Sequence, residues 1–212
     1  LAKAKGLEKV FIHIIADGRD VPERSLSKFV EKLQKELPEN SQISDIVGRF
    51  YAMDRDTNWQ RTEKAYRLYT FGDGKNMATP KEAIEDFYNE SDESDYYFEP
   101  YKIGDTEKGL IKKEDSVIFF NFRTDRAKQI TDAFTLEDFE HFERPFKKVN
   151  CFVAFGEYSK VADVAFMTEK GIRNLGQEVS EAGFAQLRIA ETEKFPHVTF
   201  FFNSQHKPPY KG

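Results

Sequence analysis

The chain has 212 residues, of which 39% are hydrophobic and 15% aromatic, so it can bury a core and is too rich in aromatic side chains for a disordered protein. Its formal net charge of −5 argues against nucleic acid as the main partner, because such proteins usually carry a basic excess or tail. The lone cysteine, Cys151, rules out an internal disulfide, and no apolar run reaches the roughly 18 residues of a membrane helix. We therefore expect a globular, cytoplasmic protein whose positive charges gather, if anywhere, in a local site for a small anion.

The apolar pattern predicts strands that alternate with helices along the chain. The first strand is predicted at 10–15, an apolar and β-branched run, and an amphipathic helix follows at 25–37. This alternation predicts an α/β fold, with a mainly parallel sheet flanked by helices on both faces in a three-layer α/β/α sandwich. The other predicted strands are 43–47, 96–103, 116–120, 149–155 and 186–189, and the other predicted helices are 59–69, 80–88, 125–134 and 171–182. Residues 190–203 fit either a helix or a strand.

The two ends of the chain have the composition of helix-end and linker segments. Residues 1–6 read as the last turn of a helix, with late lysines and a glycine stop, and residues 207–212 are typical of a linker. No repeat and no internal boundary is evident. We expect residues 1–203 to form part of one domain and residues 204–212 to lead toward another, so that the chain is a fragment of a longer protein.

Three strand-to-helix loops place arginine beside aspartate. They are residues 17–20 (DGRD), 48–56 (GRFYAMDRD) and 121–126 (NFRTDR), and the charged segment 190–197 also follows a predicted strand. Because the carboxyl ends of parallel strands meet at one edge of a sheet, these loops are expected to converge. Arginine binds phosphate and carboxylate through two bonds at once, so the cluster predicts a site for a ligand such as a phosphorylated carboxylic acid. The five arginines are Arg19, Arg49, Arg55, Arg123 and Arg126.

Two roles fit the aspartates of these loops. They can hold the guanidinium groups in place, or one of them can act as a base that a neighbouring arginine keeps ionised. The alternative to ligand binding, for each arginine and its neighbouring aspartate, is an ion pair that only fixes the loop. His13 is expected to be a core histidine and Asp17 to bond the loop backbone. The four His and one Cys show no ligand spacing, so no metal site is predicted in this chain.

The charged segments together resemble cofactor-independent (2,3-bisphosphoglycerate-independent) phosphoglycerate mutase. The matching stretches are DGRD at 17–20, GRFYAMDRD at 48–56, FFNFRTDR at 119–126 and IAETEK at 189–194, in family order. The resemblance implies a glycolytic isomerase that interconverts 3-phosphoglycerate and 2-phosphoglycerate through a phosphoserine intermediate. It also implies two domains. One is similar to alkaline phosphatase and holds the nucleophilic serine and two divalent metal ions, often manganese; the other, inserted into it, binds the glycerate and matches this chain.

The resemblance also implies a role for each matched residue. Asp20 would be the acid–base group at the glycerate hydroxyls, and Lys194 would reach the phosphate near the nucleophile. The substrate-binding set implied is Arg19, Asp20, Arg49, Arg55, Arg123, Arg126 and Lys194. The chain has no counterpart of the serine loop, of the metal-binding residues, or of the domain's first strand and its histidine segment, so the fragment alone is expected to be inactive and to bind no metal. At 203–206 it also departs from the family's usual Asn-Gly-Gly.

The alternative interpretation is a stand-alone module that binds a small phosphorylated carboxylate without converting it. In the preferred interpretation the partners are 2-phosphoglycerate, 3-phosphoglycerate and the alkaline-phosphatase-like domain of the same chain. Neither nucleic acid nor a membrane is expected to bind, and the protein is expected to be a monomer.

Overall fold

The computed structural model describes residues 3–167, 173–192, 194–206 and 208–211, and the chain divides into two compact units, residues 1–167 and 168–212. The apolar pattern gave no sign of this division, because strand-like and helix-like segments continue on both sides of it. The assignment of residues 1–203 to one domain and of 204–212 to a linker stays a prediction. Within the described residues, no helix is long and apolar enough to cross a membrane.

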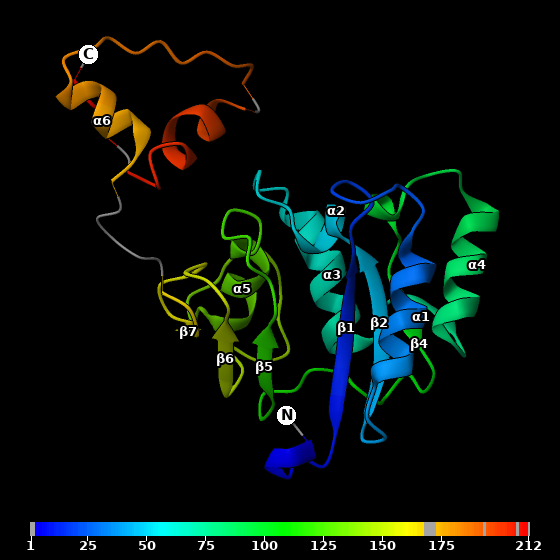
Figure 1. Ribbon diagram of the computed structural model, residues 1–212. Helices are drawn as coiled ribbons and strands as arrows, with labels where there is room; N and C mark the ends of the chain where they lie inside the picture. Colours follow the sequence, from blue (N-terminus) through cyan, green and yellow to red (C-terminus); the bar gives the residue numbers. More distant parts are fainter. Residues whose placement is uncertain (1–2, 168–172, 193, 207, 212) are drawn as a thin grey trace. The chain divides into compact units, whose positions relative to one another are not determined.

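The first unit contains two mainly parallel sheets (Figure 1). In the first, of order β1-β2-β4-β3, β1 (Val10–Ala16) runs parallel to β2 (Ser41–Gly48), and only the pairing of β2 with β4 is antiparallel. The second sheet has the order β5-β6-β7 and is parallel throughout. The remaining strands are β3 (Lys75–Met77), β4 (Tyr101–Ile103), β5 (Ser116–Phe119), β6 (Cys151–Ala154) and β7 (Asp163–Val164).

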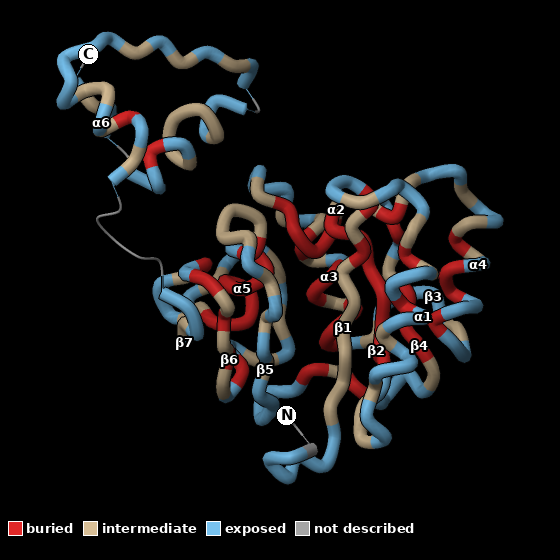
Figure 2. The backbone as a smooth tube through the Cα atoms, viewed as in Figure 1, coloured by how far each residue is buried: buried red, intermediate tan, exposed pale blue. Residues whose placement is uncertain are grey.

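Helices cover both faces of the first sheet. Neighbouring side chains of β2 show this, because they pack against different helices. Ile46 packs with α1 and α4, whereas Val47 packs with α3 and α5, and successive strand residues point to opposite faces. The predicted α/β/α sandwich is therefore confirmed, and Figure 2 shows its buried backbone concentrated in β2 and the helices. The helices are α1 (Leu26–Glu36), α2 (Arg49–Ala52), α3 (Trp59–Phe71), α4 (Pro80–Glu90) and α5 (Lys128–Thr135).

The two sheets share one layer of helices. Ile15 of β1 and Phe119 of β5 both pack against the cluster built on α3 and α5. Where the sequence predicted one sheet, β1 and β5 are each the last strand of their own sheet among the described residues, and Figure 1 draws them side by side. The common helix layer nevertheless brings the carboxyl ends of both strands to the same edge of the unit.

In the second unit, the helix predicted at 171–182 and the strand predicted at 186–189 have different outcomes. Helix α6 (Leu175–Glu181) begins where the side chain of Asn174 accepts a hydrogen bond from the Gln177 amide, while residues 171 and 172 lie outside the described residues. The strand prediction is wrong: the segment is not paired with any described strand, and Leu187 is 89% exposed. Its composition is strand-like, but a strand forms only beside a partner. Residues 190–203, left open by the sequence, contain the helical turn η3 (His197–Phe201).

The predicted strand 96–103 is split, and its first half packs on the loops that carry arginine. Residues 95–97 form a 3-10 turn, η2, and only Tyr101–Ile103 pair as β4. The carbonyl of Phe98 accepts a 2.7 Å hydrogen bond from the Gly48 amide. A Cβ on Gly48 would lie 2.3 Å from the Tyr96 carbonyl oxygen, and one on Gly18 (φ +60°) would lie 2.5 Å from the Tyr96 amide nitrogen. Both loops therefore need glycine where this backbone crosses them.

Replacing Gly48 with alanine is expected to lower the free energy of unfolding by about 2 kcal/mol, because the new methyl group meets backbone that cannot turn aside. Urea unfolding measures the loss. Gly104→Ala is the control: its Cβ meets nothing within 4 Å, and its φ of +70° adds only backbone strain of about 1 kcal/mol. A Gly48→Ala variant no less stable than Gly104→Ala contradicts the prediction.

Candidate functional site

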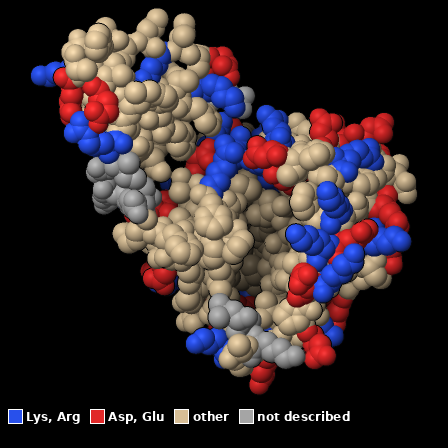
Figure 3. Space-filling model, in the orientation of Figure 1, with Lys and Arg blue, Asp and Glu red and all other residues tan. Residues whose placement is uncertain are grey.

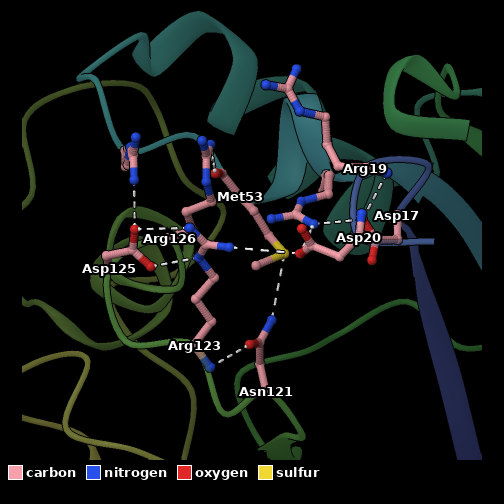
Figure 4. Close-up of polar contacts among 10 residues, drawn as sticks. Asp17, Arg19, Asp20, Met53, Asn121, Arg123, Asp125 and Arg126 are labelled. Atoms are coloured by element: carbon pink, nitrogen blue, oxygen red, sulfur yellow. Dashed lines mark hydrogen bonds and ion pairs between the residues drawn. The ribbon is translucent and has the colours of Figure 1, made fainter. Parts of the chain in front are cut away.

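The three arginine loops meet at the carboxyl ends of β1, β2 and β5 (Figure 4). One oxygen of Asp20, after β1, accepts a 2.8 Å hydrogen bond from Nη1 of Arg49, the residue that follows β2. The same oxygen lies 3.7 Å from Nη1 of Arg123, after β5. The predicted convergence is confirmed for these three loops, whereas that of segment 190–197, in the second unit, stays a prediction.

Asp17 and Asp20 together hold the guanidinium group of Arg49, whose side chain is only 7% exposed. Asp17 accepts 3.1 and 3.2 Å hydrogen bonds from the amides of Arg19 and Asp20 and a 2.5 Å bond from Arg49 Nη1, so it bonds the loop backbone as expected. The hydrogen bond from Arg49 lowers the pKa of Asp20 against a small opposing effect of burial, and the charges of Arg49, Arg123 and Arg126 lower it further. The Asp20 carboxylate is therefore ionised at neutral pH.

Asp125 joins the second pair of arginines. It accepts 2.7 Å hydrogen bonds from Arg55 Nη1 and from Arg123 Nε, on separate oxygens. Burial by itself would raise the pKa of Asp125, but the two hydrogen bonds and charges outweigh it and leave the pKa below its ordinary value. Asn121 adds a 2.8 Å bond from the Arg123 amide to its side-chain oxygen, which fixes the loop that carries both residues.

Arg126 is the cation of the cluster that no described carboxylate pairs with. Its Nη1 donates at 3.3 Å to the carbonyl of Met53, and its buried Nε has no hydrogen-bond partner. Burial lowers the pKa of Arg126, and the like charges of Arg55 and Arg123 lower it further. The other three guanidinium groups of the cluster pair with carboxylates, including Asp56, whose Oδ1 lies 3.9 Å from Arg55 Nε. Arg126 is therefore the group of the cluster that is left to bind an anion. Elsewhere the face drawn in Figure 3 mixes both signs.

The side chain of Arg19 packs against an aromatic ring, and Lys194 belongs to the second unit. The guanidinium of Arg19 points away from the carboxylate of Asp20 in Figure 4, and its Cζ lies 5.1 Å from the ring centre of Tyr96. Lys194 belongs to the second unit and is exposed. The substrate-binding and catalytic roles of all the predicted site residues stay predictions.

Sequence reasoning missed Asp54 and Gln129, which hold the loop that carries Arg55. Asp54, with a 2% exposed side chain, accepts hydrogen bonds from the backbone and side-chain nitrogens of Asn58 at 2.9 and 3.0 Å. Gln129 accepts a 3.0 Å bond from the amide of Thr57, which has a φ of +61°. The contact between Asp54 and Asn58 could have been indicated by the sequence, because an Asp followed four residues later by an Asn just before a helix is a turn signal. No local pattern indicates the contact between Thr57 and Gln129.

His13 has a hydrogen-bond partner, as expected of a structural histidine, but it is half-buried rather than part of the core. Its Nδ1 lies 2.6 Å from Oδ2 of Asp45, which is fully buried. Among the residues that the structure describes, no group of three or more His, Cys, Asp or Glu side chains could hold a metal ion.

Comparison with known proteins identifies the family. The family model described as "BPG-independent PGAM N-terminus" matches residues 1–160. The chain belongs to the BPG-independent phosphoglycerate mutase family. The match is to the N-terminal part of these mutases and includes every arginine of the cluster.

The curated relatives of the family are considerably longer than this chain. It is 45% identical to the 2,3-bisphosphoglycerate-independent phosphoglycerate mutase of Moorella thermoacetica and 43% identical to that of Clostridium tetani, in each case over all of this chain and 42% of the relative. It also resembles a crystal structure of Leishmania mexicana phosphoglycerate mutase at low cobalt concentration, with a TM-score of 0.79 and 29% identity over 99% of this chain and 41% of the other. The chain therefore spans less than half the length of these mutases.

The burial of Asp54 leads to a prediction about pH. Burial alone would raise the pKa of Asp54, but the hydrogen bonds from Asn58 outweigh it and hold the pKa below 3.8. The unfolded chain then binds a proton at a higher pH than the folded chain does. The stability that this carboxylate contributes is complete well above pH 3.8 and is lost as the pH falls through the lowered pKa.

Asp54→Asn is expected to cost about 1–3 kcal/mol of unfolding free energy at neutral pH, because the amide cannot accept the same set of bonds. Its stability should also fall less steeply than that of the wild type between about pH 5 and about pH 3. Urea unfolding across this range is the measurement. The control is Asp56→Asn, whose side chain is 70% exposed. Parallel pH curves for wild type and Asp54→Asn contradict the prediction.

Proposed function

We propose that this chain is the substrate-binding part of a longer, glycolytic phosphoglycerate mutase that interconverts 3-phosphoglycerate and 2-phosphoglycerate. The observation that carries the proposal is Arg126, a half-buried cation that no described carboxylate pairs with, beside three further arginines from converging loops. Both phosphoglycerates carry a phosphate and a carboxylate, and guanidinium forks bind both groups. The names of the relatives support the same substrates.

In this proposal the arginines bind and orient the glycerate while Asp20 moves its protons. The five arginines of the loops hold the phosphate and carboxylate so that the glycerate keeps its place while the phosphoryl group is away from it. Asp20 gives a proton to the hydroxyl oxygen that loses the phosphoryl group and takes one from the hydroxyl that receives it. The negative charge of a bound ligand raises the low pKa of Asp20, which brings it closer to the range of a group that gives and takes protons.

The phosphoryl transfer itself is assigned to the part of the longer protein outside this chain. There we place the serine that carries the phosphoryl group and two divalent metal ions, with manganese as the first candidate; divalent ions stabilise the charge of a transferring phosphoryl group. The metal named for the Leishmania mexicana relative is cobalt. In this proposal the residues of this chain bind and orient the glycerate and move its protons. Lys194 is proposed to reach the phosphate, and the protein to act as a cytoplasmic monomer.

The test is a mutase assay on the full-length protein with manganese present. Arg123→Ala is expected to lower kcat/KM by about 10²-fold or more, and Asp20→Asn to lower kcat by about 10²–10⁴-fold, because each removes a charged group at the glycerate. Arg67→Ala, which breaks an exposed pair with Asp73, is the control and should stay near the wild-type rate. Near-normal rates in both site variants would remove these assignments.

Arg126 allows binding to be separated from folding. Arg126→Met keeps most of the side-chain volume and removes a half-buried charge among like charges, so it is expected to stabilise the unliganded protein by about 1 kcal/mol. The same change should weaken binding of 3-phosphoglycerate by about tenfold or more. Thermal unfolding with and without 3-phosphoglycerate measures both effects. Loss of stability without loss of binding contradicts this role, and binding by a full-length wild type that shows no turnover would favour the stand-alone binding module.

A further inference from the structure

Tyr96 brings an aromatic ring to the arginine loops from a segment that carries no arginine. It lies in η2 (Asp95–Tyr97), within the acidic stretch between α4 and β4. The guanidinium carbon of Arg19 lies 5.1 Å from the centre of its ring. An arginine above a tyrosine ring at this separation is attracted by the negative charge on the face of the ring.

The position of this ring is fixed by packing on several sides. Phe50, in the loop after β2, meets it edge-on with 5.7 Å between the ring centres. The backbone of Tyr96 is the part of the chain that leaves no room for a Cβ at Gly18 or Gly48. The preceding residue, Asp95, is 1% exposed and accepts 2.8 Å hydrogen bonds from the amides at 25 and 26, where α1 begins. The ring therefore holds a constant place relative to the loop that carries Arg19.

The orientation of Arg19 agrees with this contact. Figure 4 shows the guanidinium of Arg19 pointing away from its chain neighbour Asp20, and its Cζ lies over the ring of Tyr96.

We propose that Tyr96 is a positioning residue of the phosphoglycerate site, which holds the guanidinium of Arg19 beside the cluster and away from Asp20. Stacking uses the face of a guanidinium, whereas its N–H groups donate in the plane, so a stacked arginine can bind an oxyanion without leaving the ring. Ordering the side chain before the ligand arrives lowers the entropy lost on binding. This inference rests on the proposed function and adds to it a residue outside the arginine motifs.

The test compares Tyr96 with an aromatic residue that contacts an arginine outside the site, in the full-length protein. Tyr96→Leu is expected to raise KM for 3-phosphoglycerate about two- to fivefold while kcat changes by less than about twofold, since only the order of Arg19 is lost. Tyr96→Phe keeps the ring and should restore most of the affinity. Phe71→Leu, which removes the ring 5.0 Å from the guanidinium carbon of Arg67 outside the site, is the matched control and should leave KM unchanged. A Tyr96→Leu variant with the KM of the wild type overturns the proposal.

A double-mutant cycle separates positioning from general damage to the fold. If Tyr96 acts through Arg19, adding Tyr96→Leu to Arg19→Ala should cause little further loss; fully additive losses overturn the proposal. If the full-length wild type shows no turnover, the proposed function fails by itself. The same variants are then compared by calorimetry for the Kd of 3-phosphoglycerate, and the Tyr96 proposal fails if wild type and Tyr96→Leu bind equally or both fail to bind.

Discussion

The close packing of the backbone of residues 95–98 on Gly18 and Gly48 is the contact on which the arginine cluster depends. The ion pairs alone are a weak support, because the Asp20 carboxylate that links Arg49 and Arg123 is 65% exposed, and exposed pairs contribute little to stability. Backbone contacts and the 2.7 Å hydrogen bond between Gly48 and Phe98 fix the path of two loops independently of their side chains. The guanidinium groups then meet at short range because their loops already do.

Three arginines of the cluster pair with carboxylates, and the fourth, Arg126, is what suits the cluster to an anion. Asp17 and Asp125 accept hydrogen bonds from the guanidinium groups of Arg49, Arg55 and Arg123, so these cations are ordered without a ligand. Arg126 has no such partner among the described residues, and burial beside like charges makes it unfavourable in the unliganded fold. Sites that bind a charged ligand commonly trade stability for function in this way.

The sequence predicted most of the first unit because its elements carry strong local signals. The apolar run at 10–15 and the amphipathic pattern at 25–37 became β1 and α1 with small shifts at their ends. Prediction failed where the outcome depends on a distant partner. Residues 186–189 have strand composition but no described strand beside them. The residues before β4 were predicted as part of a strand but form a turn, because they pack on the arginine loops.

The arginine and aspartate residues of the three loops, and the order in which they occur, are determined by the sequence alone. This is why the family, and a site suited to an anionic ligand, could be predicted from it. The tertiary structure decided which of these residues act together. It grouped Arg49, Arg55, Arg123 and Arg126 around Asp20 and Asp125 and turned Arg19 onto Tyr96. It also supplied Asp54 and Gln129 as supports of the Arg55 loop. The physical reason is the same in each case. Residue type and spacing encode local conformation, whereas a contact between side chains 70 positions apart, such as Arg55 and Asp125, exists only once the sheets bring their loops together.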